Sequence, residues 1–162
     1  MATKQKNKIF LVSILVFIFF ILVLAFIIQY RLDHQPCKLC TYERIPYFVS
    51  ALLIIKMLLV NKNEKIISLI ISLIFFIGFL LSFYHFGIEQ GFFRESFACT
   101  TDIDKTLTKE NLLEELKNNN IISCKDVTFR ILGLSLATIN TIFSLGLSAI
   151  FTKLFIDYGK NK

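Results

Sequence analysis

Four long apolar stretches, separated by polar segments, dominate the chain. Residues 9–28 form the first, a run of twenty apolar or small residues without a charge. At about 1.5 Å per residue, a helix of this length covers about 30 Å, the thickness of the hydrocarbon core of a bilayer. Residues 41–60, 66–86 and 129–155 form the other three stretches. The pattern predicts an all-α membrane protein, a bundle of four transmembrane helices.

A proline in the second stretch bears on where its helix begins. Pro46 lacks a backbone N–H and bends a helix whose interior contains it. A helix that starts at Pro46 and ends at Val60 has only fifteen residues and covers about 22 Å. We therefore predict one longer helix over residues 41–60, kinked near Pro46.

Small and hydroxylated residues are concentrated in the fourth stretch. They are Ser135, Thr138, Asn140, Thr141, Ser144 and Ser148. In membranes such residues allow helices to approach closely and to hydrogen-bond to one another. We expect this helix to pack tightly against a neighbouring helix.

The composition agrees with a single membrane domain over residues 1–162. The chain is 55% hydrophobic, which is too apolar for an ordinary soluble domain, and its length allows one compact unit. The net charge is +6, but no basic patch is interleaved with aromatic residues as on nucleic-acid-binding surfaces. We expect the lipid bilayer as a partner and no nucleic acid.

Four crossings divide the polar segments between the two sides of the membrane. Loops 29–40 and 87–128 must share one side, and both termini share the other with the turn 61–65. Nine lysines against Glu64 and Asp157 lie on the terminal side, in short segments that flank the spans. The positive-inside rule therefore predicts cytoplasmic termini and outward-facing loops.

All four cysteines lie in the two outward loops. Cys37 and Cys40 form a Cys-x-x-Cys motif before the second stretch, and Cys99 and Cys124 lie in the longer loop. An even number of cysteines in an oxidising compartment is typical of disulfides. We expect disulfide chemistry and no metal, while a zinc site with four cysteine ligands is the alternative.

The cysteine spacing bears on whether a bridge is structural or redox-active. A bridge between Cys37 and Cys40 closes too small a loop to stabilise the fold much, because the entropic benefit grows with loop length. Redox cycling explains this pair better. A bridge between Cys99 and Cys124 closes a longer loop, and on spacing alone it can be purely structural.

Two polar residues near helix ends have both a functional and a structural interpretation. Arg44 follows Cys40 by one helical turn, so its guanidinium can favour a thiolate there. As a structural residue it would anchor the helix at the interface or pair with Glu43. His85 ends the third span and can deliver protons, or it can be satisfied by Glu89 or a loop carbonyl.

Several short motifs, in a fixed order along the chain, carry a family resemblance. They are CKLCTYER at residues 37–44, YHFGIE at residues 84–89, SFAC at residues 96–99, CKD at residues 124–126, and GLSLA at residues 133–137. Together with the four spans and four cysteines, over about residues 9–155, they resemble the DsbB family of bacterial disulfide bond formation proteins.

The resemblance implies a chemical role for each cysteine. DsbB proteins are membrane quinone reductases that reoxidise the periplasmic thiol oxidase DsbA. By resemblance, the redox disulfides are Cys37–Cys40 and Cys99–Cys124. Cys99 would form the mixed disulfide with DsbA, and electrons would then move to the inner pair. Cys40 would face the quinone.

The resemblance also implies a cofactor, a partner and a location. Arg44 and His85 would join Cys40 in binding ubiquinone or menaquinone, Arg44 by stabilising negative charge and His85 by hydrogen-bonding a carbonyl. The chain would be a protein-disulfide oxidoreductase of the bacterial inner membrane, with its cysteines in the periplasm. Its partner would be a DsbA-like thioredoxin-fold oxidase.

Two other interpretations remain open. A protein related to vitamin K epoxide reductase also combines a four-helix bundle, a Cys-x-x-Cys motif and a quinone. In that family the motif follows the other cysteine pair, whereas here it comes first. A non-enzymatic membrane protein would instead use its cysteines as staples or metal ligands. It would bind stoichiometric metal, or keep its cysteines oxidised regardless of quinone.

Overall fold

The computed structural model of the chain is mostly helical. It describes residues 2–31, 36–60, 63–94, 99, 124–125, 130–131 and 133–160, so the loops predicted over 29–40 and 87–128 lie partly outside the described residues. The elements are α1 (Ala2–Arg31), α2 (Lys38–Tyr42), α3 (Ile45–Val60), α4 (Glu64–Glu89), β1 (Arg130–Ile131), β2 (Leu134–Ser135) and α6 (Leu136–Lys160).

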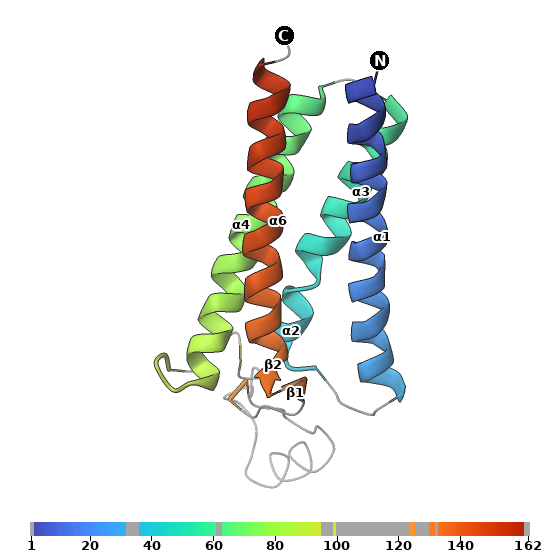
Figure 1. Ribbon diagram of the computed structural model, residues 1–162. Coiled ribbons are helices and arrows are strands. Elements are labelled where there is room, and N and C mark those ends of the chain that lie inside the picture. The colour runs from blue at the N-terminus through green and yellow to red at the C-terminus, as the bar shows by residue number, and fades with distance from the viewer. Residues whose placement is uncertain are drawn as a thin grey trace, which may run out of the picture.

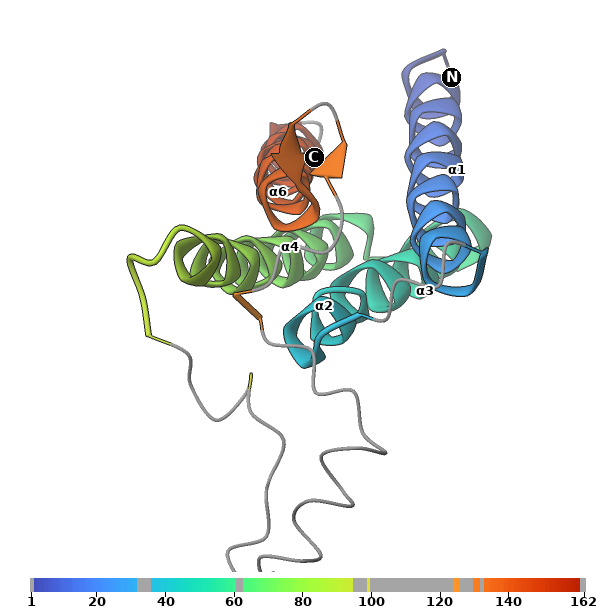
Figure 2. The same cartoon turned by 90° about the horizontal axis from the view of Figure 1, so that it is seen from below.

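The long helices run up and down, with both termini at one end and α2 and the strands at the other (Figure 1). Seen from below, α4 lies between α6 and α3, and α1 lies against α3 (Figure 2). Phe17 of α1 meets Phe143 of α6, with ring centroids 5.3 Å apart. Within the described residues, three helical segments are long and apolar enough to cross a membrane: Asn7–Arg31, Glu64–Glu89 and Leu136–Lys160.

The second apolar stretch differs from the single kinked helix that we predicted. It forms α2 and α3, separated by a turn at Glu43 and Arg44. Pro46 is the second residue of α3, where a missing N–H removes no helical hydrogen bond. The proline therefore starts a new helix, and α3 has 16 residues, fewer than the other three long helices.

The fourth helix begins later than predicted. The short strands β1 and β2 pair antiparallel before it, Arg130 with Ser135 and Ile131 with Leu134. Gly133, directly before β2, has φ +84°, which a glycine adopts without steric cost. Helix α6 starts at Leu136 and continues to Lys160, beyond the predicted end at residue 155.

Serine residues bring α4 and α6 into close contact. The Ser72 hydroxyl donates to the Ser148 carbonyl, and the Ser148 hydroxyl donates to the Ser72 carbonyl, each at 3.1 Å. One turn away, Ser68 donates to the Phe151 carbonyl at 2.9 Å. These bonds agree with the packing expected of the fourth stretch. They join the first half of α4 to the second half of α6.

Helix α3 packs against α4 through a small residue. A Cβ atom on Gly78 would lie 3.2 Å from the Pro46 ring, so a larger side chain would push the two helices apart. Nearby, the Tyr47 ring meets Phe75 edge to face, with centroids 5.4 Å apart, and Phe75 stacks on Phe151. This aromatic column joins α3, α4 and α6 and places the start of α3 beside the middle of α4.

Candidate functional site

Cys37 is positioned by the start of α2. Its sulfur accepts a hydrogen bond from the Cys40 N–H at 3.2 Å and so caps the helix. The Thr41 hydroxyl donates to the Cys37 carbonyl at 3.3 Å. The Cys-x-x-Cys motif therefore folds into one helical turn, and this turn places both sulfurs at the same end of α2.

The four cysteines gather in one cluster with Leu39 and Ile88. Cys37, Cys99 and Cys124 are buried, Cys40 is half-buried, and all four are free thiols. The thiol of Cys37 hydrogen-bonds to Cys40 on one side and to Cys124 on the other, and Cys124 in turn contacts Cys99. The sulfurs therefore form a continuous series in the order Cys40, Cys37, Cys124, Cys99.

The neighbours of Cys37 make its thiol more acidic than an ordinary cysteine. Hydrogen bonds from Cys124 and Cys40, followed by His85, lower its pKa well below the usual value although burial opposes the shift. The bond to Cys37, together with burial, raises the pKa of Cys124. Negative charge therefore concentrates on the central sulfur, and the thiolate is the nucleophile in exchange.

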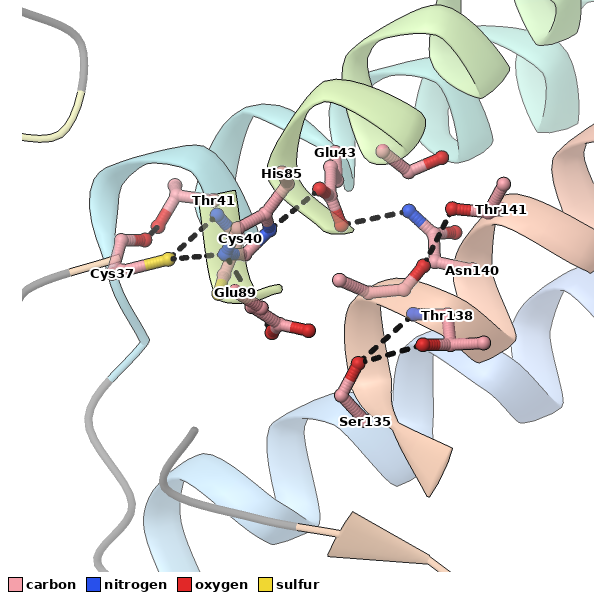
Figure 3. A network of polar contacts seen from close by, with 12 residues as sticks. Cys37, Cys40, Thr41, Glu43, His85, Glu89, Ser135, Thr138, Asn140 and Thr141 are labelled. Atoms are coloured by element: carbon pink, nitrogen blue, oxygen red, sulfur yellow. Dashed lines mark hydrogen bonds and ion pairs between the residues drawn. The ribbon is translucent and has the colours of Figure 1, made fainter. Parts of the chain in front are cut away.

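A chain of polar side chains connects Cys37 to α6 (Figure 3). His85 Nε2 lies 3.6 Å from Cys37 Sγ, and His85 Nδ1 lies 2.8 Å from Glu43 Oε1. The other Glu43 oxygen accepts from Asn140 Nδ2 at 2.8 Å. The Asn140 oxygen accepts from the Tyr47 hydroxyl at 2.5 Å. His85 and Glu43 are buried.

The geometry of this chain fixes the orientation of the imidazole. A carboxylate only accepts hydrogen bonds, so His85 donates from Nδ1 to Glu43 and presents Nε2 to the Cys37 sulfur. Asn140 donates to the second Glu43 oxygen and keeps the carboxylate in place. The arrangement can accept a proton from the Cys37 thiol at Nε2 and stabilise the resulting imidazolium.

A separate groove lies on the α1 side of α2. It has a volume of about 340 Å³ and is lined by Phe26, Gln29, Tyr30, Thr41, Arg44, Ile45 and Phe48. Arg44 Nη1 donates to the Gln29 side-chain oxygen at 2.6 Å, and the Arg44 guanidinium lies over the Phe26 ring, 5.3 Å from its centroid. The groove thus combines aromatic walls with hydrogen-bond donors at one end.

The structure brings together five of the six residues that the sequence nominated. The four cysteines and His85 share one cluster, and His85 and the two sulfurs of the Cys-x-x-Cys motif lie close enough for one metal ion to bridge them. Arg44 lies apart, in the groove, and its contacts are with α1. Its predicted effect on Cys40 therefore stays a prediction, as does the disulfide pairing.

Sequence reasoning missed the functional position of Glu43 and Asn140. Glu43 was considered only as a partner of Arg44, and Asn140 only as a residue for helix packing. Both are strongly polar residues beside or inside apolar stretches, where an unpaired side chain costs several kcal/mol. That cost was the available signal, and it points to a buried partner such as His85.

Comparison with known proteins gives a consistent family assignment. A family model described as "Disulfide bond formation protein DsbB" matches residues 7–154. An uncharacterized protein of Rickettsia prowazekii (strain Madrid E), RP370, is 26% identical over 160 residues, which cover 98% of this chain and 92% of that protein. No solved structure matches the chain.

Proposed function

We propose, because this chain belongs to the DsbB family of disulfide bond formation proteins, that it reoxidises a DsbA-like thiol oxidase and passes the electrons to a membrane quinone. The partner would contribute two thiols and leave with a disulfide. Two electrons and two protons would therefore enter the cysteines for each partner oxidised, and the same number would leave to the quinone.

The continuous series of four sulfurs is the observation that carries this proposal. Starting from Cys37–Cys40 and Cys99–Cys124 disulfides, the partner dithiol reduces the outer bridge. The Cys124 thiolate then attacks Cys37, forming a Cys37–Cys124 bond and releasing Cys40. Attack of Cys99 on Cys124 restores the outer disulfide and releases Cys37, so the inner pair ends as the dithiol.

His85 and Glu43 support the middle of this relay. When Cys37 is released, its thiolate is stabilised by the neighbouring Cys40 thiol and by the protonated His85 ring, whose Nε2 lies 3.6 Å away. When the Cys37 thiol must become a thiolate, His85 Nε2 accepts its proton. Glu43 stabilises the protonated imidazole through Nδ1, and Asn140 keeps Glu43 oriented.

The groove beside Arg44 fits a quinone head group. Phe26, Tyr30 and Phe48 supply aromatic walls, and Arg44 and the Gln29 side-chain amide supply hydrogen-bond donors toward ring oxygens. A bound quinone supplies the two-electron acceptor. Thr41 lines this groove and is adjacent in sequence to Cys40, which contacts Cys37. Cys40 is therefore the cysteine through which the series reaches the groove.

Replacing Arg44 tests the assignment of the groove. We expect Arg44→Met to raise the KM for quinone about 10–100-fold, because a charge-assisted donor to the ring oxygen is lost. The rate at which the protein's disulfides exchange with a partner dithiol should stay unchanged. Arg31→Met, at the exposed end of α1, is the matched control and should leave the KM unchanged. An equal effect of both substitutions would contradict the assignment.

The same proposal includes the orientation in the membrane. Residues 38–60 of α2 and α3 together cover about 34 Å, enough for a fourth crossing beside the three longer spans. The lysine-rich terminal end would face the cytoplasm and the cysteine end the periplasm of a bacterial inner membrane.

Quinone reduction by the purified protein tests the proposed function. Detergent-solubilised protein is mixed with a reduced DsbA-like protein and with ubiquinone or menaquinone analogues. We expect catalytic quinone reduction, with one quinone reduced for each partner disulfide formed. Partner oxidation at the uncatalysed rate with both quinones would overturn the proposal.

A further inference from the structure

The inner cysteine pair and His85 also form a possible set of metal ligands. Cys37 Sγ, Cys40 Sγ and the His85 ring nitrogen all lie within 4.8 Å of one another. Thiolate sulfur and imidazole nitrogen are the ligands that Zn²⁺ prefers, and around one tetrahedral ion such atoms lie roughly 3–4 Å apart. Small side-chain rotations would therefore bring these three atoms around one ion.

The orientation of His85 matches that of a zinc ligand. Its Nδ1 is held by the Glu43 carboxylate at 2.8 Å, and its Nε2 is directed at the Cys37 sulfur. Zinc-binding histidines almost always donate their second ring N–H to a carboxylate or a carbonyl, which fixes the ring and increases its basicity. Glu43 and Asn140 provide that support here.

Glu89 lies next to His85, outside this three-residue set. Its Oε1 lies 3.9 Å from His85 Nε2, and its side chain is only 7% exposed. Within the part of the chain that the structure describes, Glu89 Oε2 has no hydrogen-bond partner although it is buried. Buried carboxylate oxygens are nearly always paired, so an unpaired one next to the imidazole of this set is a further sign of a cation site.

We propose that the dithiol form of this protein binds one Zn²⁺ through Cys37, Cys40 and His85, with a shift of the Glu89 side chain supplying the fourth ligand. A Cys37–Cys40 disulfide removes both sulfur ligands, so only the reduced protein binds the ion. Thiolates that are bound to zinc are not free to pass electrons to the quinone, so the ion would inhibit turnover. That inhibition rests on the proposed function, whereas zinc binding itself does not.

Zinc binding is measured directly on the reduced protein. After reduction in detergent and removal of the reductant, we expect one Zn²⁺ bound per chain, and none after oxidation to disulfides. Co²⁺ in the same site should give sulfur-to-metal charge-transfer absorption and the intense visible bands of tetrahedral coordination. No stoichiometric zinc, or weak octahedral Co²⁺ bands without charge transfer, would overturn the proposal without affecting the test of quinone reduction.

Matched cysteine variants locate the site. The Cys99→Ala/Cys124→Ala protein keeps the inner pair and should retain one Zn²⁺, whereas Cys37→Ala/Cys40→Ala keeps the outer pair and should bind none. Glu43→Gln should weaken binding about 10–100-fold, as loss of a supporting carboxylate does at other zinc sites. The reverse pattern in the two double variants would show that the outer cysteines bind zinc, and it would refute the assignment.

Discussion

Cys40→Ser and Cys99→Ala variants are each expected to lose steady-state oxidation of a DsbA-like partner, but at different steps. Cys99→Ala lacks the outer disulfide, so partner oxidation should fall to the uncatalysed rate from the first turnover. Cys40→Ser keeps the outer pair, so it should oxidise about one equivalent of partner and then stop. Rapid mixing with reduced partner, followed by quenching and thiol counting, separates the two results.

Oxidation of one equivalent of partner by Cys40→Ser would also show that this variant is folded. Binding of a quinone analogue to Cys99→Ala should match the unaltered protein, because the groove beside Arg44 is lined by other residues. Steady-state oxidation at the unaltered rate by either variant would show that electrons do not follow the series of sulfurs.

Removal of Glu43 is expected to have the second-largest effect. Glu43→Ala leaves His85 and Asn140 without their buried acceptor. Each unpaired group costs about 1–3 kcal/mol of stability. We therefore expect the free energy of unfolding to fall by about 2–5 kcal/mol and turnover to fall at least about tenfold. Denaturant unfolding in detergent micelles measures the first quantity, and the quinone assay measures the second.

Two further variants separate stability from chemistry at this position. Glu43→Gln keeps the size of the side chain and one accepting oxygen, so it should fold while shifting the pH profile of turnover. Glu64→Ala removes a carboxylate from the first turn of α4, far along the helix from His85, and should change the stability by less than about 0.5 kcal/mol. Equal losses for Glu43→Ala and Glu64→Ala would argue against a specific role for Glu43.

Much of the helical architecture could be predicted because apolar runs longer than about 18 residues have few alternatives to a membrane helix. The first and third stretches correspond to the candidate spans Asn7–Arg31 and Glu64–Glu89. Helix ends were less predictable. The turn at Glu43 depends on buried partners from α4 and α6, which hydropathy along one segment does not reveal.

The site was partly predictable for a related reason. Cysteines in two loops at one end of a helical bundle are brought close by topology, and His85 lies near the end of α4 that leads into the second of these loops. His85 is 42 positions from Glu43, and Asn140 is 97 positions from Glu43. No short sequence motif therefore predicts these two hydrogen bonds. Arg44 was placed by helical periodicity from Cys40, and the break after α2 turns it toward α1 instead.

The groove between α1 and α2 bears on how the two substrates reach the protein. Its walls come from Phe26, Tyr30 and Phe48, whereas the outer cysteines pack beside Ile88 at the end of α4. Under the proposed function, the lipid-soluble quinone would enter the groove sideways from the bilayer. The water-soluble partner protein would dock at the outer cysteines from the aqueous side. Excess of one substrate would then leave the binding of the other unimpeded, and the enzyme would avoid competitive substrate inhibition.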